Sequence, residues 1–308
     1  YYSYRAIHCE GSLNIIGNGK DVSKLSAASY GCCIYSDYYY TEDESEAVPD
    51  TINDAIEGCS IETVSINYDG INWAYPLTIK DSSISVFADD EGIDTDDSVN
   101  IVGSEVLLNM CGDDGIYSEN EVSVTDSVLK IHSYNECIDA DDDVTITDSD
   151  LNLHSESEEG IDSSEDISVK GGRLIIVADE NVLESDALTL DDVVFYLQTC
   201  NSSFDIIDIR YAANSEDVRF SLPGKFTLYD EDGEELYSGE WQEDMLDDDN
   251  YLVYDDIDVF TASTIHEHSW SEEWESNDTH HWHECDTKYC DETNDEAKDG
   301  YGEHETEV

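Results

Sequence analysis

The sequence predicts an all-β protein built on a right-handed parallel β-helix of about eight coils. A short phrase recurs along the chain, in which a small residue precedes an Ile between acidic neighbours. Successive copies of this Ile are 22 or 23 residues apart, and self-similarity at a fixed period of this length is typical of a solenoid. The five regular copies lie at Ile71, Ile93, Ile116, Ile138 and Ile161.

Two pairs of aliphatic residues follow each repeated Ile at constant offsets. After Ile71 they are Leu77 with Ile79, then Ile84 with Val86. Residues two apart share one face of a strand, whereas an amphipathic helix needs apolar residues three and four apart. Each coil is therefore predicted to contain two strands and a short third segment at the Gly-Ile phrase. Stacked parallel coils of this kind are right-handed. A β-sandwich with coincidental spacing is the alternative.

Three regions of the chain differ in pattern. Residues 1–200 carry the repeat, with an insertion near residues 37–56, where one step of the repeat lengthens to 37 residues. Residues 201–262 contain a hairpin signal with an Asp-Gly turn. They are predicted to form a β cap, because an uncapped solenoid would expose pairing edges. Residues 263–308 lose the periodicity and form an acidic tail module rich in His, Cys and Trp.

Charge and composition limit the possible partners. The chain has 77 Asp plus Glu against 12 Lys plus Arg, a formal net charge of −65. This charge argues against nucleic acid and anionic membrane surfaces as partners and favours divalent cations. No apolar run approaches the length of a membrane span. The start at Tyr1 rather than Met fits a processed, secreted product.

Nine cysteines are present, which fits an oxidising compartment but leaves one thiol over. Cys9 could bridge neighbouring coils with Cys32 or Cys33, and Cys285 is close enough in sequence to pair with Cys290.

Acidic residues concentrate in the turn around each repeated Ile. Stacked coils lie about 4.8 Å apart, and like charges at that distance repel by about 3–4 kcal/mol at an effective dielectric of 20. Several calcium ions along this edge would offset the repulsion, because calcium prefers carboxylate and carbonyl oxygen ligands. A solvated acidic edge is the alternative. The predicted ligands are Asp89, Asp90, Glu91, Asp94, Asp96, Asp113, Asp114, Glu136, Asp139, Asp141, Glu158, Glu159 and Asp162.

The outward positions of the two longer strands carry no acid in the five regular coils. Such faces could bind sugar chains through hydroxyl, amide and aromatic groups, or could contact neighbouring molecules. The alternative is that Thr and Val simply suit strands. The predicted binding residues are Thr78, Asn100, Ser123 and Thr145 on one face and Phe87, Asn109, His132 and His154 on the other.

The tail combines His and Cys at a density that suggests a zinc site with four nitrogen or sulfur ligands. Its spacing matches no zinc-finger pattern closely, and a disulfide between Cys285 and Cys290 is the alternative. The candidate zinc ligands are His266, His268, His281, His283, Cys285 and Cys290.

The repeated Asp-Asp-Gly-Ile phrase, with the strand phrases at residues 12–17 and 144–149, resembles a family of secreted bacterial carbohydrate-binding domain-containing proteins. The resemblance covers about residues 5–240. It implies a calcium-binding right-handed parallel β-helix at the bacterial surface that binds plant-type polysaccharides. The turns here are more acidic than in that family, and Cys137 and Val182 stand where it has Gly. The tail phrase 274–285 resembles a short module of surface proteins from anaerobic Gram-positive bacteria.

These patterns predict a secreted, non-enzymatic, calcium-binding protein that binds polysaccharide at the cell surface. The alternative is a structural subunit of a self-assembling extracellular filament or layer. A polysaccharide lyase or hydrolase is the third interpretation. Basic residues suited to a lyase lie away from the acidic turns, and no catalytic pair of carboxylates can be located among so many acids.

Overall fold

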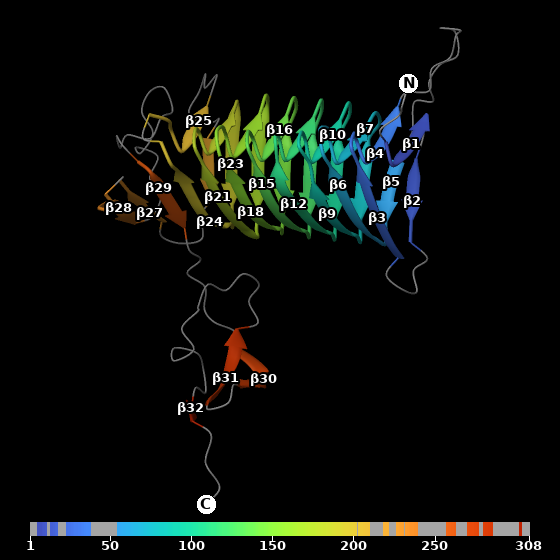
Figure 1. The fold of residues 1–308 in the computed structure, drawn as a ribbon. Coiled ribbons are helices and arrows are strands. Elements are labelled where there is room, and N and C mark those ends of the chain that lie inside the picture. Colours follow the sequence, from blue (N-terminus) through green and yellow to red (C-terminus); the bar gives the residue numbers. More distant parts are fainter. Residues whose placement is uncertain are drawn as a thin grey trace, which may run out of the picture.

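The computed structural model describes residues 5–10, 13–17, 23–37, 54–201, 203–209, 218–221, 226–230, 232–239, 257–262, 270–276, 280–285 and 302–303. Within these residues every regular element is a strand, and strands β1 to β26 stack into a parallel β-helix (Figure 1). Among them there is no helix long and apolar enough to cross a membrane.

Each coil adds one strand to each of three sheets. Sheet A has nine parallel strands: β1 (Ile7–Glu10), β4 (Ile34–Asp37), β7 (Ile71–Trp73), β10 (Ile93–Thr95), β13 (Ile116–Ser118), β16 (Ile138–Ala140), β19 (Ile161–Ser163), β22 (Leu183–Ser185) and β25 (Ile207–Ile209). Sheet B also has nine: β2 (Asn14–Ile16), β5 (Asp54–Glu57), β8 (Leu77–Lys80), β11 (Val99–Val102), β14 (Val122–Thr125), β17 (Val144–Thr147), β20 (Asp166–Lys170), β23 (Ala187–Asp191) and β26 (Val218–Ser221).

Sheet C contains the longest strands and carries the cap. Its parallel strands are β3 (Ser23–Ser29), β6 (Cys59–Ser65), β9 (Ser83–Phe87), β12 (Glu105–Cys111), β15 (Val128–Ser133), β18 (Asp150–Ser155), β21 (Arg173–Ala178) and β24 (Val194–Thr199). Antiparallel strands then extend it in the order β29 (Val259–Ala262), β27 (Phe226–Tyr229) and β28 (Glu235–Gly239).

The parallel β-helix predicted from the repeat is confirmed. Strands β1 to β24 make eight complete coils, and β25 with β26 begins a ninth. The repeated isoleucines pair directly, for example Ile71 with Ile93 and Ile93 with Ile116. The predicted hairpin is β27–β28, and Gly233 of its Asp-Gly turn has a left-handed φ of 74°.

Two boundaries differ from those expected. The solenoid continues past residue 200, because β25 and β26 extend sheets A and B as far as Ser221. The expected insertion near residues 37–56 overlaps two strands, since Asp37 ends β4 and residues 54–56 belong to β5. The longer connection is residues 38–53, which lie outside the described part of the chain.

The core is a set of aliphatic ladders running along the solenoid. Ile71, Ile116 and Ile161 are fully buried, and so are most of the inward residues of sheets B and C. Each fully buried aliphatic side chain contributes about 1.5–3 kcal/mol relative to an exposed one. Close approach requires glycine before the repeated Ile at Gly115, where a Cβ would lie 2.2 Å from Cγ2 of Ile131, whereas other coils accommodate Cys137 and Val182 at this position.

The corner between sheets B and C is a tight turn with left-handed backbone. Its first residue is Asp or Gly, and Asp81, Asp126 and Asp148 have φ values of 47°, 49° and 48°. The next residue is a buried serine in four consecutive coils. The backbone N–H of each of the first three donates a hydrogen bond of 3.1 Å to the hydroxyl of the serine in the next coil. These serines are Ser82, Ser104, Ser127 and Ser149.

One carboxylate occupies an aliphatic ladder position. Asp54 is fully buried and pairs in register with Leu77. Its Oδ2 accepts hydrogen bonds from Trp73 Nε1 and from the backbone N of Leu13, both at 3.0 Å. Asp54 therefore ties the first coil to the third.

The described cysteines of the solenoid core are buried thiols. Cys32 and Cys33 are free, so neither forms the possible bridge to Cys9. Cys137 occupies the glycine column without exposed surface, and burial raises the pKa of its thiol to about 12. The tail contains a separate antiparallel sheet of β30 (Trp270–Ser276), β31 (His280–Cys285) and β32 (Gly302–Glu303).

Candidate functional site

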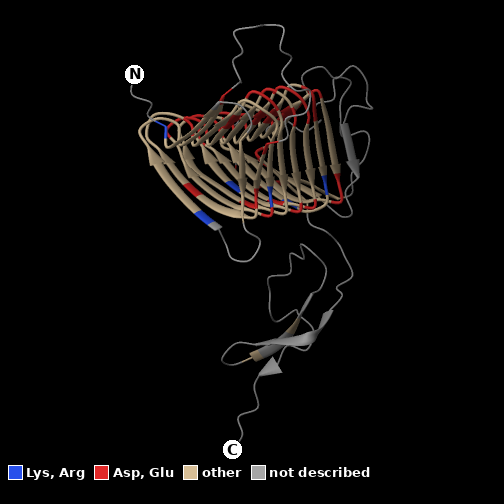
Figure 2. Ribbon diagram, turned by 90° about the vertical axis from the view of Figure 1, so that its right-hand side faces the viewer, with Lys and Arg blue, Asp and Glu red and all other residues tan. Residues whose placement is uncertain are grey.

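The acidic edge is the turn from sheet C into sheet A together with the outward side of sheet A. Figure 2 shows a dense row of Asp and Glu in the turns along one side of the solenoid and further acids at the turns on the opposite side, while the long strands are mostly uncharged. One column of the edge lies two residues before each repeated Ile, and the coil register stacks its members. This column contains Asp69, Glu91, Asp114, Glu136 and Glu159.

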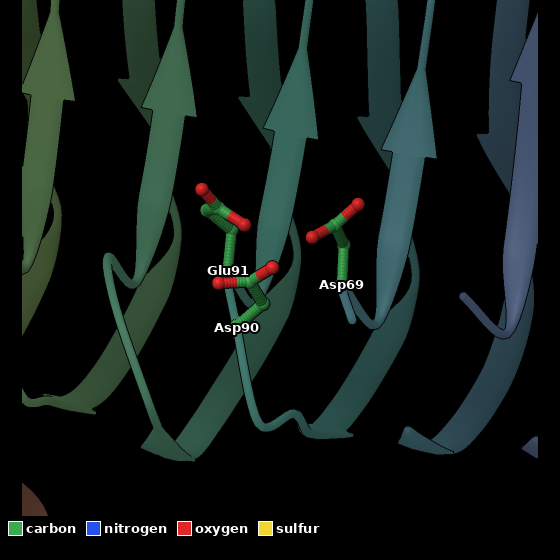
Figure 3. Close-up of side chains that lie close together, drawn as sticks. All are labelled: Asp69, Asp90 and Glu91. Atoms are coloured by element: carbon green, nitrogen blue, oxygen red, sulfur yellow. The ribbon is translucent and has the colours of Figure 1, made fainter. Parts of the chain in front are cut away.

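Three carboxylates from two coils converge near the start of β7 and β10. Asp69 precedes β7, while Asp90 and Glu91 precede β10. One oxygen from each lies within 4.8 Å of the others, and their side chains point toward a common space (Figure 3). Asp69 is only 8% exposed, so this group is partly shielded from water.

A second group repeats this geometry three coils further on. Glu136 corresponds to Asp69 in the repeat, and Glu158 and Glu159 correspond to Asp90 and Glu91. Their oxygens again lie within 4.8 Å of one another. Between the two groups, Asn135 takes the place of an acid and donates its side-chain amide to Asp113.

Burial and mutual repulsion make these carboxyls hold protons tightly. Burial, followed by contact with Asp69, raises the pKa of Glu91 to about 8. Burial, followed by the charge of Glu184, raises the pKa of Glu159 to about 8. Burial and contact with Glu136 raise the pKa of Asp114 to about 10. Each of these carboxyls therefore favours either a bound proton or a nearby bound cation at neutral pH.

The structure brings together five of the thirteen predicted calcium ligands, namely Asp90, Glu91, Glu136, Glu158 and Glu159. Asp69 completes the first group but was absent from the predicted set, although it precedes Gly70-Ile71 in the same phrase.

The other predicted ligands line the same edge in different surroundings. Asp94 on β10 accepts a hydrogen bond from Asn72, and burial raises its pKa to about 7. The remaining positions lie outside both groups of three carboxylates: Asp89, Asp96, Asp113, Asp114, Asp139, Asp141 and Asp162.

The predicted binding residues form two outward columns. On sheet B the column is Thr78, Asn100, Ser123 and Thr145, and Ser123 Oγ donates to Asn100 Oδ1 at 2.9 Å. On sheet C it is Phe87, Asn109, His132 and His154. The outward sides of the two sheets are not free of acid as a whole, because Glu57 and Asp191 lie on sheet B, and Glu62, Glu105 and Asp150 lie on sheet C.

The sheet C column borders a surface pocket of about 260 Å³ at the corner leading to sheet A. His132 and His154 stack with ring centroids 4.8 Å apart, and His132 Nε2 lies 2.8 Å from Glu156 Oε1. Its lining includes Asp89, Phe87, Met110, His132, Tyr134 and Glu156.

Met110 and Tyr134 of this pocket were not predicted. Met110 is a bulge residue between Asn109 and Cys111, with a left-handed φ of 59°. It is the extra residue of the 23-residue step from Ile93 to Ile116, and that longer step was the available signal. The bulge turns a long apolar side chain outward into solvent.

The predicted zinc ligands are only partly described. His281, His283 and Cys285 lie on β31, where His283 pairs with Trp274. His266, His268 and Cys290 lie outside the described residues, so the zinc site stays a prediction.

Comparison with known proteins gives one match. A family model described as "Carbohydrate-binding domain-containing protein" matches residues 7–205. No curated protein and no solved structure matches the chain. The matched span includes both carboxylate groups and the pocket.

Proposed function

Because the chain belongs to the family of carbohydrate-binding domain-containing proteins, we propose that its solenoid is a non-enzymatic, calcium-loaded module that binds polysaccharide outside the cell. The observation that carries this proposal is the family match over residues 7–205, which is nearly the whole β-helix. Cell-surface adhesion is the role we expect for such a module.

The central coils supply a suitable surface for an extended glycan. Rigid parallel strands present hydroxyl, amide and aromatic groups at the regular spacing of about 4.8 Å between coils. Stacked sites of this kind suit a repeating ligand, because neighbouring sugar units can meet neighbouring coils. The sheet C column adds the flat rings of Phe87, His132 and His154.

The two carboxylate groups fit a hard divalent cation. Calcium accepts carboxylate oxygens at about 2.3–2.6 Å, and three oxygens within 4.8 Å of one another can surround one ion. Asp69, Asp90 and Glu91 would hold one ion, and the second would lie between Glu136, Glu158 and Glu159. A bound ion would neutralise the repulsion between coils and keep the acidic edge rigid.

Affinity electrophoresis of the full chain in native gels containing soluble polysaccharides tests the proposal. We expect at least one polysaccharide of a set that includes neutral, acidic and amine-bearing polymers to retard the protein relative to a gel without polysaccharide, and calcium to strengthen the retardation. Migration unchanged by every polysaccharide would contradict it. Release of new reducing ends from a retarding polysaccharide would instead indicate an enzyme, and filaments in electron micrographs would indicate a structural subunit.

A further inference from the structure

The pocket on sheet C gathers exposed apolar side chains in an otherwise strongly acidic protein. Phe87, Met110 and Tyr134 are 43%, 50% and 52% exposed, and they come from three successive coils. These side chains are exposed at this corner, although polar side chains there would be better hydrated. Aromatic rings and a thioether that flank one hollow form a platform for the apolar face of a sugar ring.

The rim of the same pocket is anionic. Asp89, which follows β9, and Glu156, which follows β18, both line it, and the described lining contains no Lys or Arg. Glu156 contacts the ring of His132 at 2.8 Å yet keeps about half of its side chain exposed, at 47%. A ligand seated on the platform would therefore meet carboxylate oxygens at its edges.

The charge of the whole chain acts in the same direction. A net charge of −65 repels polyanions and concentrates cations at the surface. A ligand that stacks on Phe87 and Tyr134 and carries positive charge would satisfy both the platform and the rim.

We propose that this pocket is a subsite for a pyranose ring that carries a protonated amine, so that the preferred ligand is a glycan of deacetylated amino sugars. The assignment rests on the proposed polysaccharide binding and adds its location and ligand chemistry. The sugar ring stacks between Phe87 and Tyr134 over Met110. Its ammonium group donates hydrogen bonds to Asp89 or Glu156.

Isothermal titration of the calcium-saturated full chain in mildly acidic buffer tests the assignment. The probes are four oligosaccharides of equal length: fully deacetylated chito-oligosaccharide, its N-acetylated form, cello-oligosaccharide and oligogalacturonate. We expect the deacetylated probe to bind at least about tenfold more tightly than the others. Phe87→Ala and Tyr134→Ala should each weaken it by about tenfold.

Matched variants separate the pocket from diffuse attraction by an acidic protein. Tyr196→Ala removes an aromatic of similar exposure elsewhere on sheet C and should leave binding unchanged. Glu156→Gln should abolish the preference for the amine, whereas Glu62→Gln, an exposed acid on the same sheet, should not. Because all replaced side chains are partly exposed, we expect each variant to fold, and circular dichroism melts check this.

Each contrary outcome overturns a defined statement. If Tyr196→Ala or Glu62→Gln weakened the affinity for the deacetylated probe as much as the pocket variants do, the binding would be non-specific attraction to an acidic protein. That result would overturn the subsite. Binding of a neutral or acidic probe that pocket variants leave unchanged would overturn the subsite but not the proposed function. Failure of all four probes, together with no retardation in affinity gels, would overturn both. A dimer that Phe87→Ala dissociates would make this corner a self-interface instead.

Discussion

Replacing Glu91 with Gln should shift the thermal stability in opposite directions with and without calcium. Glu91 shares a space with Asp69 and Asp90, with oxygens within 4.8 Å of one another. Two ionised carboxylates at that distance repel by about 3–4 kcal/mol at an effective dielectric of 20. Partial protonation and solvent reduce this value, so we expect the uncharged amide to stabilise the cation-free protein by about 1–2 kcal/mol at pH 8.

Calcium reverses the sign, because the ion uses the charge that the variant removes. An ion present at a hundredfold excess over its Kd stabilises the folded protein by about 2.7 kcal/mol per site. For a domain of about 200 residues, such as the solenoid, 1 kcal/mol corresponds to about 2–4 °C in Tm, so one occupied site adds about 5–10 °C. Glu91→Gln should lose most of the gain at the first site and retain that at the second.

The pH dependence follows from the same group. Burial raises the pKa of Glu91 from its ordinary value of 4.5 to about 8, so the folded protein binds this proton more tightly than the unfolded chain. Without calcium, this contribution to stability is complete below pH 4.5 and is lost as pH rises through about 8. Calcium should flatten the loss, because it replaces the proton.

Differential scanning calorimetry in chelator and in calcium, across this pH range, measures all three effects. Glu121→Gln is the matched control, since Glu121 is an exposed acid of the turn before β14 and outside both groups. The reasoning is refuted if Glu91→Gln changes Tm equally in chelator and in calcium. It is also refuted if wild-type Tm is the same in both.

Three further predictions concern the fold and are measured by urea denaturation. Gly115→Ala should destabilise by about 1–3 kcal/mol, because its Cβ would lie 2.2 Å from Ile131; an unchanged midpoint would contradict this. Ile138→Ala should cost about 2–5 kcal/mol by opening a cavity in a fully buried ladder; a loss below that range would count against a tightly packed ladder. Asp54→Ala should cost about 1–3 kcal/mol and shift Trp73 fluorescence, because the buried indole N–H of Trp73 and the partly buried backbone N–H of Leu13 lose their acceptor. An unchanged Trp73 fluorescence would argue against the hydrogen bond from Trp73.

Most of the solenoid was predictable because aliphatic residues recur at the period of its coils. Inward positions of stacked strands must be apolar in every coil, so Ile116 and its partners repeat with little freedom. The end of the solenoid was harder to place. Strands β25 and β26 follow irregular steps, and the cap strand β29 reaches β24 from about sixty residues later in the chain. Tertiary pairing of that kind leaves no local periodic signal.

The candidate site was predictable as an edge but not as a set of ligands. The sequence period predicts that the acids share one edge of the solenoid, but it does not predict which carboxylate oxygens converge. The convergence at Asp69, Asp90 and Glu91 depends on side-chain direction in the turn. Asn135 stands at the repeat position that Asp90, Asp113 and Glu158 occupy in other coils, and there an amide that donates to Asp113 replaces a carboxylate. The pocket depended on a bulge at Met110, where one extra residue changes the facing of a side chain.

A glycan array probed with the labelled full chain, in calcium and in chelator, tests polysaccharide binding most directly. We expect selective binding to a small set of polysaccharides, stronger in calcium. Phe87→Ala should weaken the signal, while Tyr196→Ala should preserve it. An array with no glycan bound above background in either condition would contradict the central claim that this β-helix is a carbohydrate-binding protein.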